Sequence, residues 1–258
     1  MTAAPLLQVE RLGRRFGGLA AVADLSFRVD QDEIVSIIGP NGAGKTTAFN
    51  LITCIYQPNT GAIRFAGRDL AGMPLHKVTQ SGIARTFQNL RIFPNLTVRE
   101  NVLVGLTRRN KSSMLSALLR LPAYRAEEQR LSDIADKLVH LVGLDAVADQ
   151  LARHLPYGDQ RRVEIARALA TDPKLLLLDE PAAGMNPAEI DELNGLIRRL
   201  RDELKTTILM VEHHMSLVMG ISDRVIVMDQ GRKIAEGTPD QVKSDPAVIS
   251  AYLGSGTV

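Results

Sequence analysis

The spacing of apolar and polar residues divides the chain into three stretches, and the first predicts strands. Residues 6–12 (LLQVERL) and 21–29 (AVADLSFRV) alternate between apolar and polar positions, which is typical of antiparallel strands with one face in water. Residues 33–39 (EIVSIIG) are almost continuously apolar, as expected of a buried central strand. The strand-rich stretch continues through TGAIRFAGRDL at 60–70.

The second stretch, from about residue 89 to 165, has no strand pattern. SMLSALLRL (113–121) and AEEQRLSDIADKLVHLVGL (126–144) both predict helices, and the polar RRNKSS (108–113) predicts a loop. HLPYGDQRRVEIARAL (154–169) predicts a turn followed by a helix, because its apolar residues recur at spacings of three and four. We interpret this block as a helical lobe inserted into another domain.

The third stretch, from residue 174, alternates between strands and helices. KLLLLDE (174–180) and TTILMVEHH (206–214) predict buried strands on either side of a helix at 187–204. DRVIVMDQGRKIAEG (223–237) predicts a hairpin turning at DQGR, and the tail from 238 starts with a Thr cap and Pro at the first helical position. This alternation predicts an α/β fold in which helices cover a parallel sheet.

Composition narrows the class of protein. The 258 residues include 31 Lys and Arg against 29 Asp and Glu, a formal net charge of +2, which is too small to indicate a nucleic-acid binder. A single cysteine, Cys54, excludes an internal disulfide framework and fits a reducing compartment. No apolar run approaches the roughly 20 residues of a membrane span, and we see no secretion signal. A role at a membrane would therefore be exercised through a partner protein.

GPNGAGKTT at 39–47 fits the phosphate-loop pattern, and it follows a predicted strand and precedes a predicted helix. Its glycines allow the backbone to curl so that N–H groups point at phosphate oxygens. Lys45 is predicted to reach the terminal phosphates, and Thr46 to supply its hydroxyl to Mg²⁺. An ordinary glycine-rich turn is the alternative. The nucleotide-binding residues predicted here are Gly39, Pro40, Asn41, Gly42, Ala43, Gly44, Lys45, Thr46 and Thr47.

Two acidic residues follow the strand of four leucines. Asp179 and Glu180 fall at its carboxyl end, where open α/β sheets place their ligands. Asp179 is predicted to hold Mg²⁺ directly or through water, and Glu180 to be the base that polarises the attacking water. A solvent-exposed acidic pair is the alternative interpretation.

Three further residues are candidates for the site. His213 ends a buried strand and is predicted to approach the terminal phosphate, whereas the adjacent His214 should point to the opposite face. Gln88 marks the passage from the core to the helical lobe, and a surface glutamine is its alternative. Phe16 lies in a glycine-flanked turn and either stacks on adenine or packs in the core.

One feature of the helix near 158 is unexpected. Arg161 and Arg162 occupy its first turn, although a helix N-terminus favours negative charge. An incoming phosphate, or acids such as Asp159 and Glu164, would offset them. A helix entered through Gly158 is itself a suitable anion site, because its unpaired N–H groups favour phosphate.

Together these motifs resemble the ATP-binding subunit of an ABC transporter. GPNGAGKTT resembles Walker A, Gln88 the Q-loop, LPYGDQ (155–160) the signature, LLLLDEP (175–181) Walker B, AAGMNP (182–187) the D-loop and His213 the switch histidine. YGDQRRVEIARAL, DEPAAGMNP and LVMGISDRVIVMDQG more narrowly resemble the LivG-type subunits of branched-chain amino acid importers, as do the insert around 112–125 and the ending AYLG.

The resemblance implies one ABC ATPase domain over 1–258. Residues 1–88 and 166–258 would form the P-loop core, a mixed sheet with an N-terminal antiparallel β part, and 89–165 the inserted α-helical signature subdomain. It implies ATP and Mg²⁺ as cofactors, with Gln88 catalytic and a metal ligand beside Thr46 and Asp179. Tyr157, Gly158 and Asp159 would face the ATP of a second ATP-binding subunit, identical or related, in a head-to-tail dimer.

The implied partners are that second subunit, two transmembrane permease subunits and, indirectly, a periplasmic-type solute-binding protein, with no nucleic acid. The expected location is the cytoplasmic face of the bacterial inner membrane. An importer of amides, urea or aromatic acids would look similar. A DNA- or ribosome-acting ABC ATPase and a small-molecule kinase are the alternatives from other classes. The former usually carries a coiled coil or two cassettes, and the latter needs no signature segment.

The signature departs from the family pattern L-S-G-G-Q. The serine position is occupied by Pro156, which offers neither a hydroxyl nor an N–H group to the opposite phosphate. Losing one hydrogen bond to a charged group costs roughly 1.5–3 kcal/mol, which is tolerable if Gly158 and the helix N–H groups remain. The D-loop likewise has Asn186 near the place of its usual aspartate.

Overall fold

The computed structural model describes residues 4–109 and 122–254, so the helix predicted at 113–121 lies outside the described residues. The chain divides into two compact units, Met1–Arg85 with Lys174–Val258, and Thr86–Pro173. The boundary expected between 165 and 166 would cut the continuous helix α6 (Tyr157–Leu169), so the division falls later. The other boundary falls a few residues before the expected 88, at the end of strand β6 (Ile83–Arg85).

In the described part of the first unit, the larger sheet has six strands in the order β10-β9-β3-β8-β7-β6. Its strands from β9 to β6 pair in parallel, and β10 closes one edge antiparallel. All residues of β3, β7 and β8 are buried, which is why their sequences are continuously apolar. Besides β6, these strands are β3 (Ile34–Ile38), β7 (Leu175–Asp179), β8 (Thr207–Val211), β9 (Arg224–Asp229) and β10 (Arg232–Gly237).

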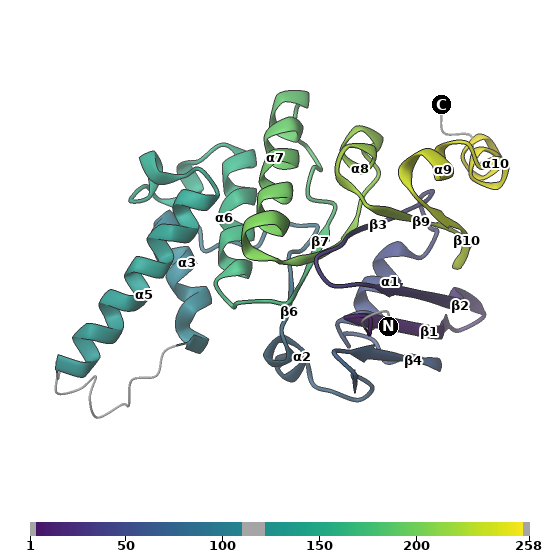
Figure 1. The fold of residues 1–258 in the computed structure, drawn as a ribbon, viewed down its shortest axis with the longest axis horizontal. Helices are drawn as coiled ribbons and strands as arrows, with labels where there is room; N and C mark the ends of the chain where they lie inside the picture. Colours follow the sequence, from purple (N-terminus) through teal and green to yellow (C-terminus); the bar gives the residue numbers. More distant parts are fainter. Residues whose placement is uncertain (1–3, 110–121, 255–258) are drawn as a thin grey trace. The chain divides into compact units, whose positions relative to one another are not determined.

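The predicted antiparallel part is a second sheet with the order β2-β1-β4-β5. Helix α1 (Lys45–Ile52) lies between the two sheets (Figure 1), and its fully buried Phe49 and Ile52 belong to one apolar core with residues of both. The glycine loop before α1 is thereby anchored on two sides. The strands are β1 (Leu7–Phe16), β2 (Leu19–Val29), β4 (Thr60–Phe65) and β5 (Arg68–Asp69).

Helices α7 and α8 cover the face of the larger sheet opposite α1 (Figure 1). The start of α7 is set by a capping box between Asn186 and Glu189, with Pro187 in the first turn. Thr238 and Gln241 form the same device at the start of α9. The helices outside the core are α2 (Leu75–Ser81), α7 (Pro187–Leu204), α8 (Met215–Ile221), α9 (Pro239–Lys243) and α10 (Pro246–Gly254).

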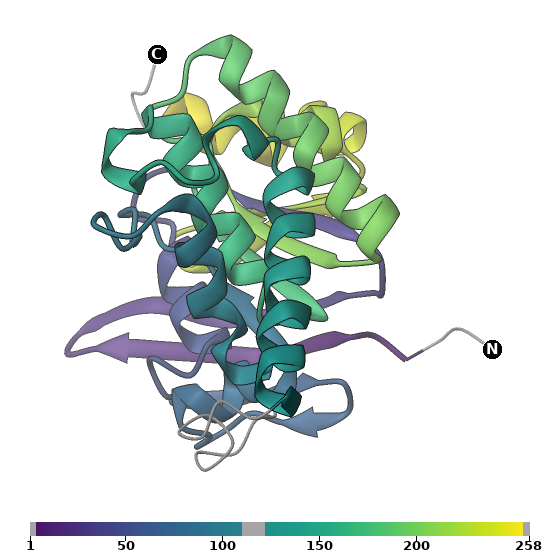
Figure 2. The ribbon, with the colours of Figure 1, turned by 90° about the vertical axis from the view of Figure 1, so that its left-hand side faces the viewer.

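Apart from one isolated bridge between Thr97 and Leu151, the regular elements described in the second unit are helices, as the sequence predicted for this block. Helices α3 and α5 pack side by side (Figure 2), and both also contact α6. Gly105 allows α3 to approach α6 closely, because a Cβ there would lie 2.4 Å from the carbonyl oxygen of Arg167 in α6. Besides α6, the elements described in this unit are α3 (Val98–Leu106), η1 (Thr107–Arg109), α5 (Pro122–Leu141), η2 (Asp145–Val147) and η3 (Ala152–His154).

Candidate functional site

The glycine loop is shaped by close backbone approaches. A Cβ on Gly39 would lie 2.0 Å from the carbonyl oxygen of Met228, and one on Gly44 would lie 2.3 Å from that of Ala21. Gly39, Gly42 and Gly44 have φ angles of 149°, 81° and 94°, which L side chains rarely adopt. Such a curled loop ahead of a helix directs backbone N–H groups into one concavity, which fits phosphate oxygens.

The Lys45 side chain is buried against this loop. Its Nζ donates to the carbonyl oxygens of Gly39 at 2.7 Å and Pro40 at 3.0 Å. Burial lowers the pKa of Lys45, and the carboxylates of Glu180 and Glu212 oppose that shift. A desolvated ammonium beside an N–H-lined loop is a strong partner for phosphate. Thr46 is exposed in the first turn of α1, and Thr47 is partly buried.

Asp179 is held in place by an arginine that the sequence analysis did not single out. Its Oδ2 lies 2.7 Å from Nη2 of Arg85, and both side chains are more than nine-tenths buried. Arg85 also donates to Asn50 Oδ1 at 2.8 Å and Thr53 Oγ1 at 3.1 Å, both on or next to α1. This network ties the end of β7 to the helix that follows the glycine loop.

Glu180 follows in a strained backbone conformation, with φ of 47°. Such non-glycine outliers cluster at functional sites, and this one is supported by a hydrogen bond from its N–H to the carbonyl of Val211 at 2.9 Å. Its Oε2 lies 4.0 Å from Nδ1 of His213. The structure therefore brings Lys45, Asp179, Glu180 and His213 to one end of the same sheet.

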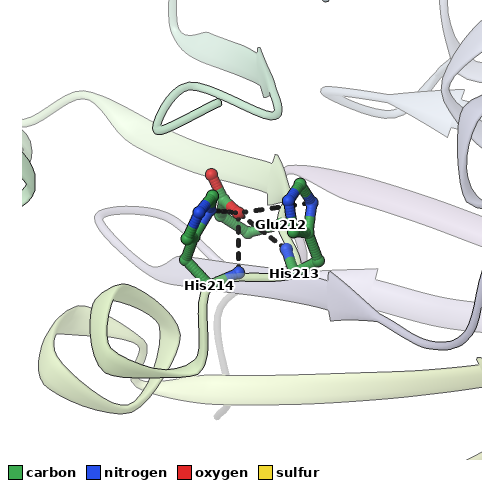
Figure 3. A group of neighbouring side chains, drawn as sticks. All are labelled: Glu212, His213 and His214. Carbon is green, nitrogen blue, oxygen red and sulfur yellow. Dashed lines mark hydrogen bonds and ion pairs between the residues drawn. The ribbon is translucent and has the colours of Figure 1, made fainter. Parts of the chain in front are cut away.

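Glu212, fully buried beside the candidate histidine, is a central hydrogen-bond acceptor that sequence reasoning missed. Figure 3 shows its carboxylate between two imidazole rings. Oε2 accepts from the N–H groups of His213 at 2.6 Å and His214 at 2.9 Å and lies 3.0 Å from Nδ1 of His214. Oε1 accepts from the N–H of Ala182 at 2.9 Å. A carboxylate directly after a buried strand was the available signal.

The Glu212, His213 and His214 group also has a spacing suited to a metal, since its ligand atoms lie within 4.8 Å of one another. A metal would have to displace existing donors, because Oε2 already meets three nitrogen atoms and Oε1 meets one. We therefore interpret the group as a hydrogen-bond centre that orients the two histidines. Oxygen ligands that suit Mg²⁺ are present instead at Thr46 and Asp179.

Phe16 lies at the tip of the β1–β2 hairpin and is 40% exposed. Its ring meets Tyr56 edge-on with centroids 5.2 Å apart. The Arg14 guanidinium lies 4.8 Å from the centroid of Phe16 and 5.7 Å from that of Tyr56. An exposed ring supported on one side suits stacking on a flat ligand, and Tyr56 is an aromatic neighbour that the sequence analysis did not predict.

Gln88 and the signature residues lie in the second unit. Gln88 and Tyr157 are exposed, and Gly158 is buried in the first turn of α6. The sequence analysis predicted that the helix begins at Gly158, and this was wrong. Pro156 occupies the N-cap, and α6 starts at Tyr157. The N-cap makes no side-chain hydrogen bond. Asp159 lies 3.9 Å from Arg162 and partly offsets its charge.

Tyr252 of α10 is a further contact of the glycine loop. Burial raises the pKa of its phenol, and the nearby backbone of Gly39 opposes that shift. The C-terminal helix thus reaches the loop at its first residue. The sequence analysis included Tyr252 only within the ending AYLG and gave it no role.

Comparison with known proteins gives consistent matches. The family model for "ABC transporter" matches residues 22–183, and that for "Branched-chain amino acid ATP-binding cassette transporter" matches residues 232–257. The high-affinity branched-chain amino acid transport ATP-binding proteins BraF of Pseudomonas aeruginosa and LivG of Escherichia coli K12 are each 48% identical, over 97% of this chain and 98% of theirs.

A solved structure agrees with these sequence matches. The crystal structure of the ADP conformation of an ABC transporter's ATP-binding cassette has a TM-score of 0.83 and 31% identity, covering 98% of this chain and 100% of its own. Among the described residues, no helix is both long and apolar enough to cross a membrane.

Proposed function

This chain belongs to the ABC transporter family and hydrolyses ATP, and we propose that it powers the import of branched-chain amino acids. The observation that carries the ATPase role is the glycine loop with buried Lys45, set at one sheet end with Asp179 and Glu180. The cargo rests on the relatives, because an ATPase subunit does not contact the transported solute.

In the proposed mechanism, backbone N–H groups of the glycine loop and the Lys45 ammonium would bind the β- and γ-phosphates of ATP; Pro40 has no N–H group to contribute. Thr46, Asp179 and Gln88 would hold Mg²⁺, which neutralises charge on the phosphate oxygens when bound. Phe16 would stack on the adenine.

Glu180 would then orient and polarise the attacking water. The N–H of Glu180 donates to the carbonyl of Val211 on the neighbouring strand, and this bond holds the strained backbone from which the Glu180 side chain extends. His213 would donate a hydrogen bond to the terminal phosphate, and Glu212 sets its position through the backbone N–H. Preorganised donors of this kind stabilise the charge that develops during phosphoryl transfer.

We further propose that two ATP-binding subunits, identical or related, pair head to tail, with Tyr157, Gly158 and Asp159 of one facing the ATP of the other. Two permease subunits and, indirectly, a solute-binding protein complete the transporter. The ATPase would work at the cytoplasmic face of the inner membrane. The dipole and free N–H groups at the start of α6 suit a phosphate from outside the chain.

Transport in proteoliposomes tests this proposal. The chain would be purified with the permeases that accompany it from membranes and reconstituted with the solute-binding protein. ATP inside the vesicles should drive uptake of leucine, isoleucine and valine, and Lys45→Ala should abolish both uptake and hydrolysis. Uptake of acetamide, urea or an aromatic acid in preference to leucine would overturn the proposal that branched-chain amino acids are the transported solutes. Wild-type hydrolysis by Lys45→Ala would overturn the ATP site.

A further inference from the structure

Side chains on one face of α6 form hydrogen bonds with the backbone of the loop that carries Gln88. Arg161, Glu164 and Arg167 recur every three residues along the helix and so lie on one side of it. Arg161 is fully buried and Glu164 is 2% exposed. Both belong to the second unit, as does the loop. The arginine that seemed misplaced in the first turn therefore has a partner within its own helix.

Arg161 bonds to the loop and to Glu164 at once. Its Nη1 donates to the carbonyl of Phe87 at 2.6 Å and to Glu164 Oε2 at 2.6 Å, and its Nη2 donates to the carbonyl of Gln88 at 3.0 Å. The other oxygen of Glu164 accepts from the N–H groups of Phe87 at 3.4 Å and Arg91 at 3.3 Å. A planar guanidinium is suited to such a fork.

Arg167 adds a further hydrogen bond to this loop by donating to the carbonyl of Arg91. Residues 87–91 form no helix or strand, so these side chains supply partners that a ladder would otherwise provide. The Gln88 side chain is exposed while its backbone carbonyl is held. The loop is thus held through its backbone, and Gln88 within it is an exposed residue.

A buried ion pair is weak evidence for a contribution to stability, because desolvation of the two charges offsets their attraction. Well-packed apolar residues of similar volume frequently stabilise a fold as well or better. What an apolar pair cannot supply is the hydrogen bonding to the loop backbone. The hydrogen bonds to the backbone of residues 87–91 therefore explain why charged side chains occupy positions 161 and 164.

We propose that Arg161 and Glu164 are positioning residues for ATP hydrolysis, which lock the Gln88 loop to the signature helix. The helix and the loop then respond to nucleotide as one body. This inference rests on the role proposed above for Gln88 toward Mg²⁺, and neither Arg161 nor Glu164 touches ATP in it. Loss of the pair leaves nucleotide binding in place and removes the geometry that makes Mg²⁺ effective.

The test compares the apolar double variant Arg161→Met/Glu164→Leu with the parent chain in the assembled transporter. We expect binding of a fluorescent ATP analogue without Mg²⁺ to stay within twofold. The Mg²⁺ concentration for half-maximal hydrolysis should rise, and kcat should fall, by about 10- to 100-fold, the usual effect of losing a supporting residue. Arg161→Lys should resemble the double variant, because an ammonium lacks the fork.

Arg130→Met is the matched control. Arg130 also forms an i,i+3 pair, with Glu127 on α5, and donates to the carbonyl of Arg109, although this pair is more exposed than Arg161–Glu164. It belongs to the same unit but has no bond to residues 87–91 among those described. The control should keep the parent kcat and Mg²⁺ dependence. A double variant with both values within twofold of the parent would overturn the proposal.

Hydrogen exchange separates this proposal from the role of Gln88. Glu164→Gln keeps the side-chain shape and should speed exchange at the amides of Phe87 and Arg91 at least tenfold, with or without nucleotide. Unchanged exchange overturns the lock, including in the event that the double variant fails to fold. Gln88→Ala probes the proposed function instead, since an unaltered Mg²⁺ dependence there would remove Gln88 from the metal site while leaving the exchange result intact.

Discussion

The carboxylate of Glu212 accepts a hydrogen bond from the backbone N–H of Ala182 at 2.9 Å, although 30 residues separate them. The same carboxylate holds the N–H groups of His213 and His214. One buried side chain therefore links the segment after the proposed base to the proposed phosphate-contacting histidine. A displacement of the segment at Ala182 would therefore shift His213 and His214 through the Glu212 carboxylate, and the reverse also holds.

Replacing Glu212 with glutamine should uncouple these segments. Glutamine has the same shape but turns an –NH₂ group toward backbone donors, which leaves at least one of them without an acceptor. We expect a loss of roughly 1–3 kcal/mol in unfolding free energy and a fall in kcat of at least tenfold, measured by urea denaturation and phosphate release. Glu203→Gln, exposed on α7, is the control and should change neither. Wild-type turnover by Glu212→Gln would contradict the linkage.

Glu180→Gln should bind ATP and fail to hydrolyse it. The amide cannot accept a proton from water, so kcat should fall by 10²-fold or more, while Lys45 and the glycine loop remain intact. The trapped complex should appear as a dimer in size-exclusion chromatography with Mg²⁺ and ATP. With ADP it should elute as a monomer, which is the control. Normal turnover by this variant would show that Glu180 is not the base.

Pro156→Ser should tighten ATP-dependent dimerisation. The serine restores a hydroxyl at the N-cap of α6, and a hydrogen bond to a charged phosphate is worth roughly 1.5–3 kcal/mol, or about tenfold or more in affinity. The dissociation constant of the dimer is measured by analytical ultracentrifugation in the Glu180→Gln background with ATP. Pro156→Ala removes the ring without adding the hydroxyl and should leave the affinity unchanged. A looser dimer for the serine variant would contradict this role of the position.

Gly44→Ala should damage the glycine loop itself. The added Cβ would meet the Ala21 carbonyl at 2.3 Å in a backbone with φ of 94°, and forcing an L residue there costs about 1–3 kcal/mol before the clash is counted. We expect a lower thermal midpoint and weaker nucleotide binding by isothermal titration calorimetry. Gly18→Ala has open space and no unusual φ, so it is the matched control. Equal melting of the two variants would mean that the loop can rearrange.

Sequence alone determined the elements whose signal is local. The glycine loop between a buried strand and a helix, the acidic pair after four leucines, the helix at 187–204 and the Thr238 cap of the tail were all predicted from neighbouring residues. The α/β class followed from the alternation of strand and helix patterns. These features depend on backbone conformation and on burial of contiguous residues, which a short window of sequence encodes.

Tertiary structure alone decided which distant side chains meet. Arg85 with Asp179, Glu212 with Ala182, Tyr252 with Gly39 and Arg161 with the Gln88 loop leave no periodic mark in the sequence. Each pairing arises because a buried charge or polar group must find partners once packing has excluded water. Which partner lies within reach depends on how strands and helices distant in the sequence come together, and no local pattern carries that information.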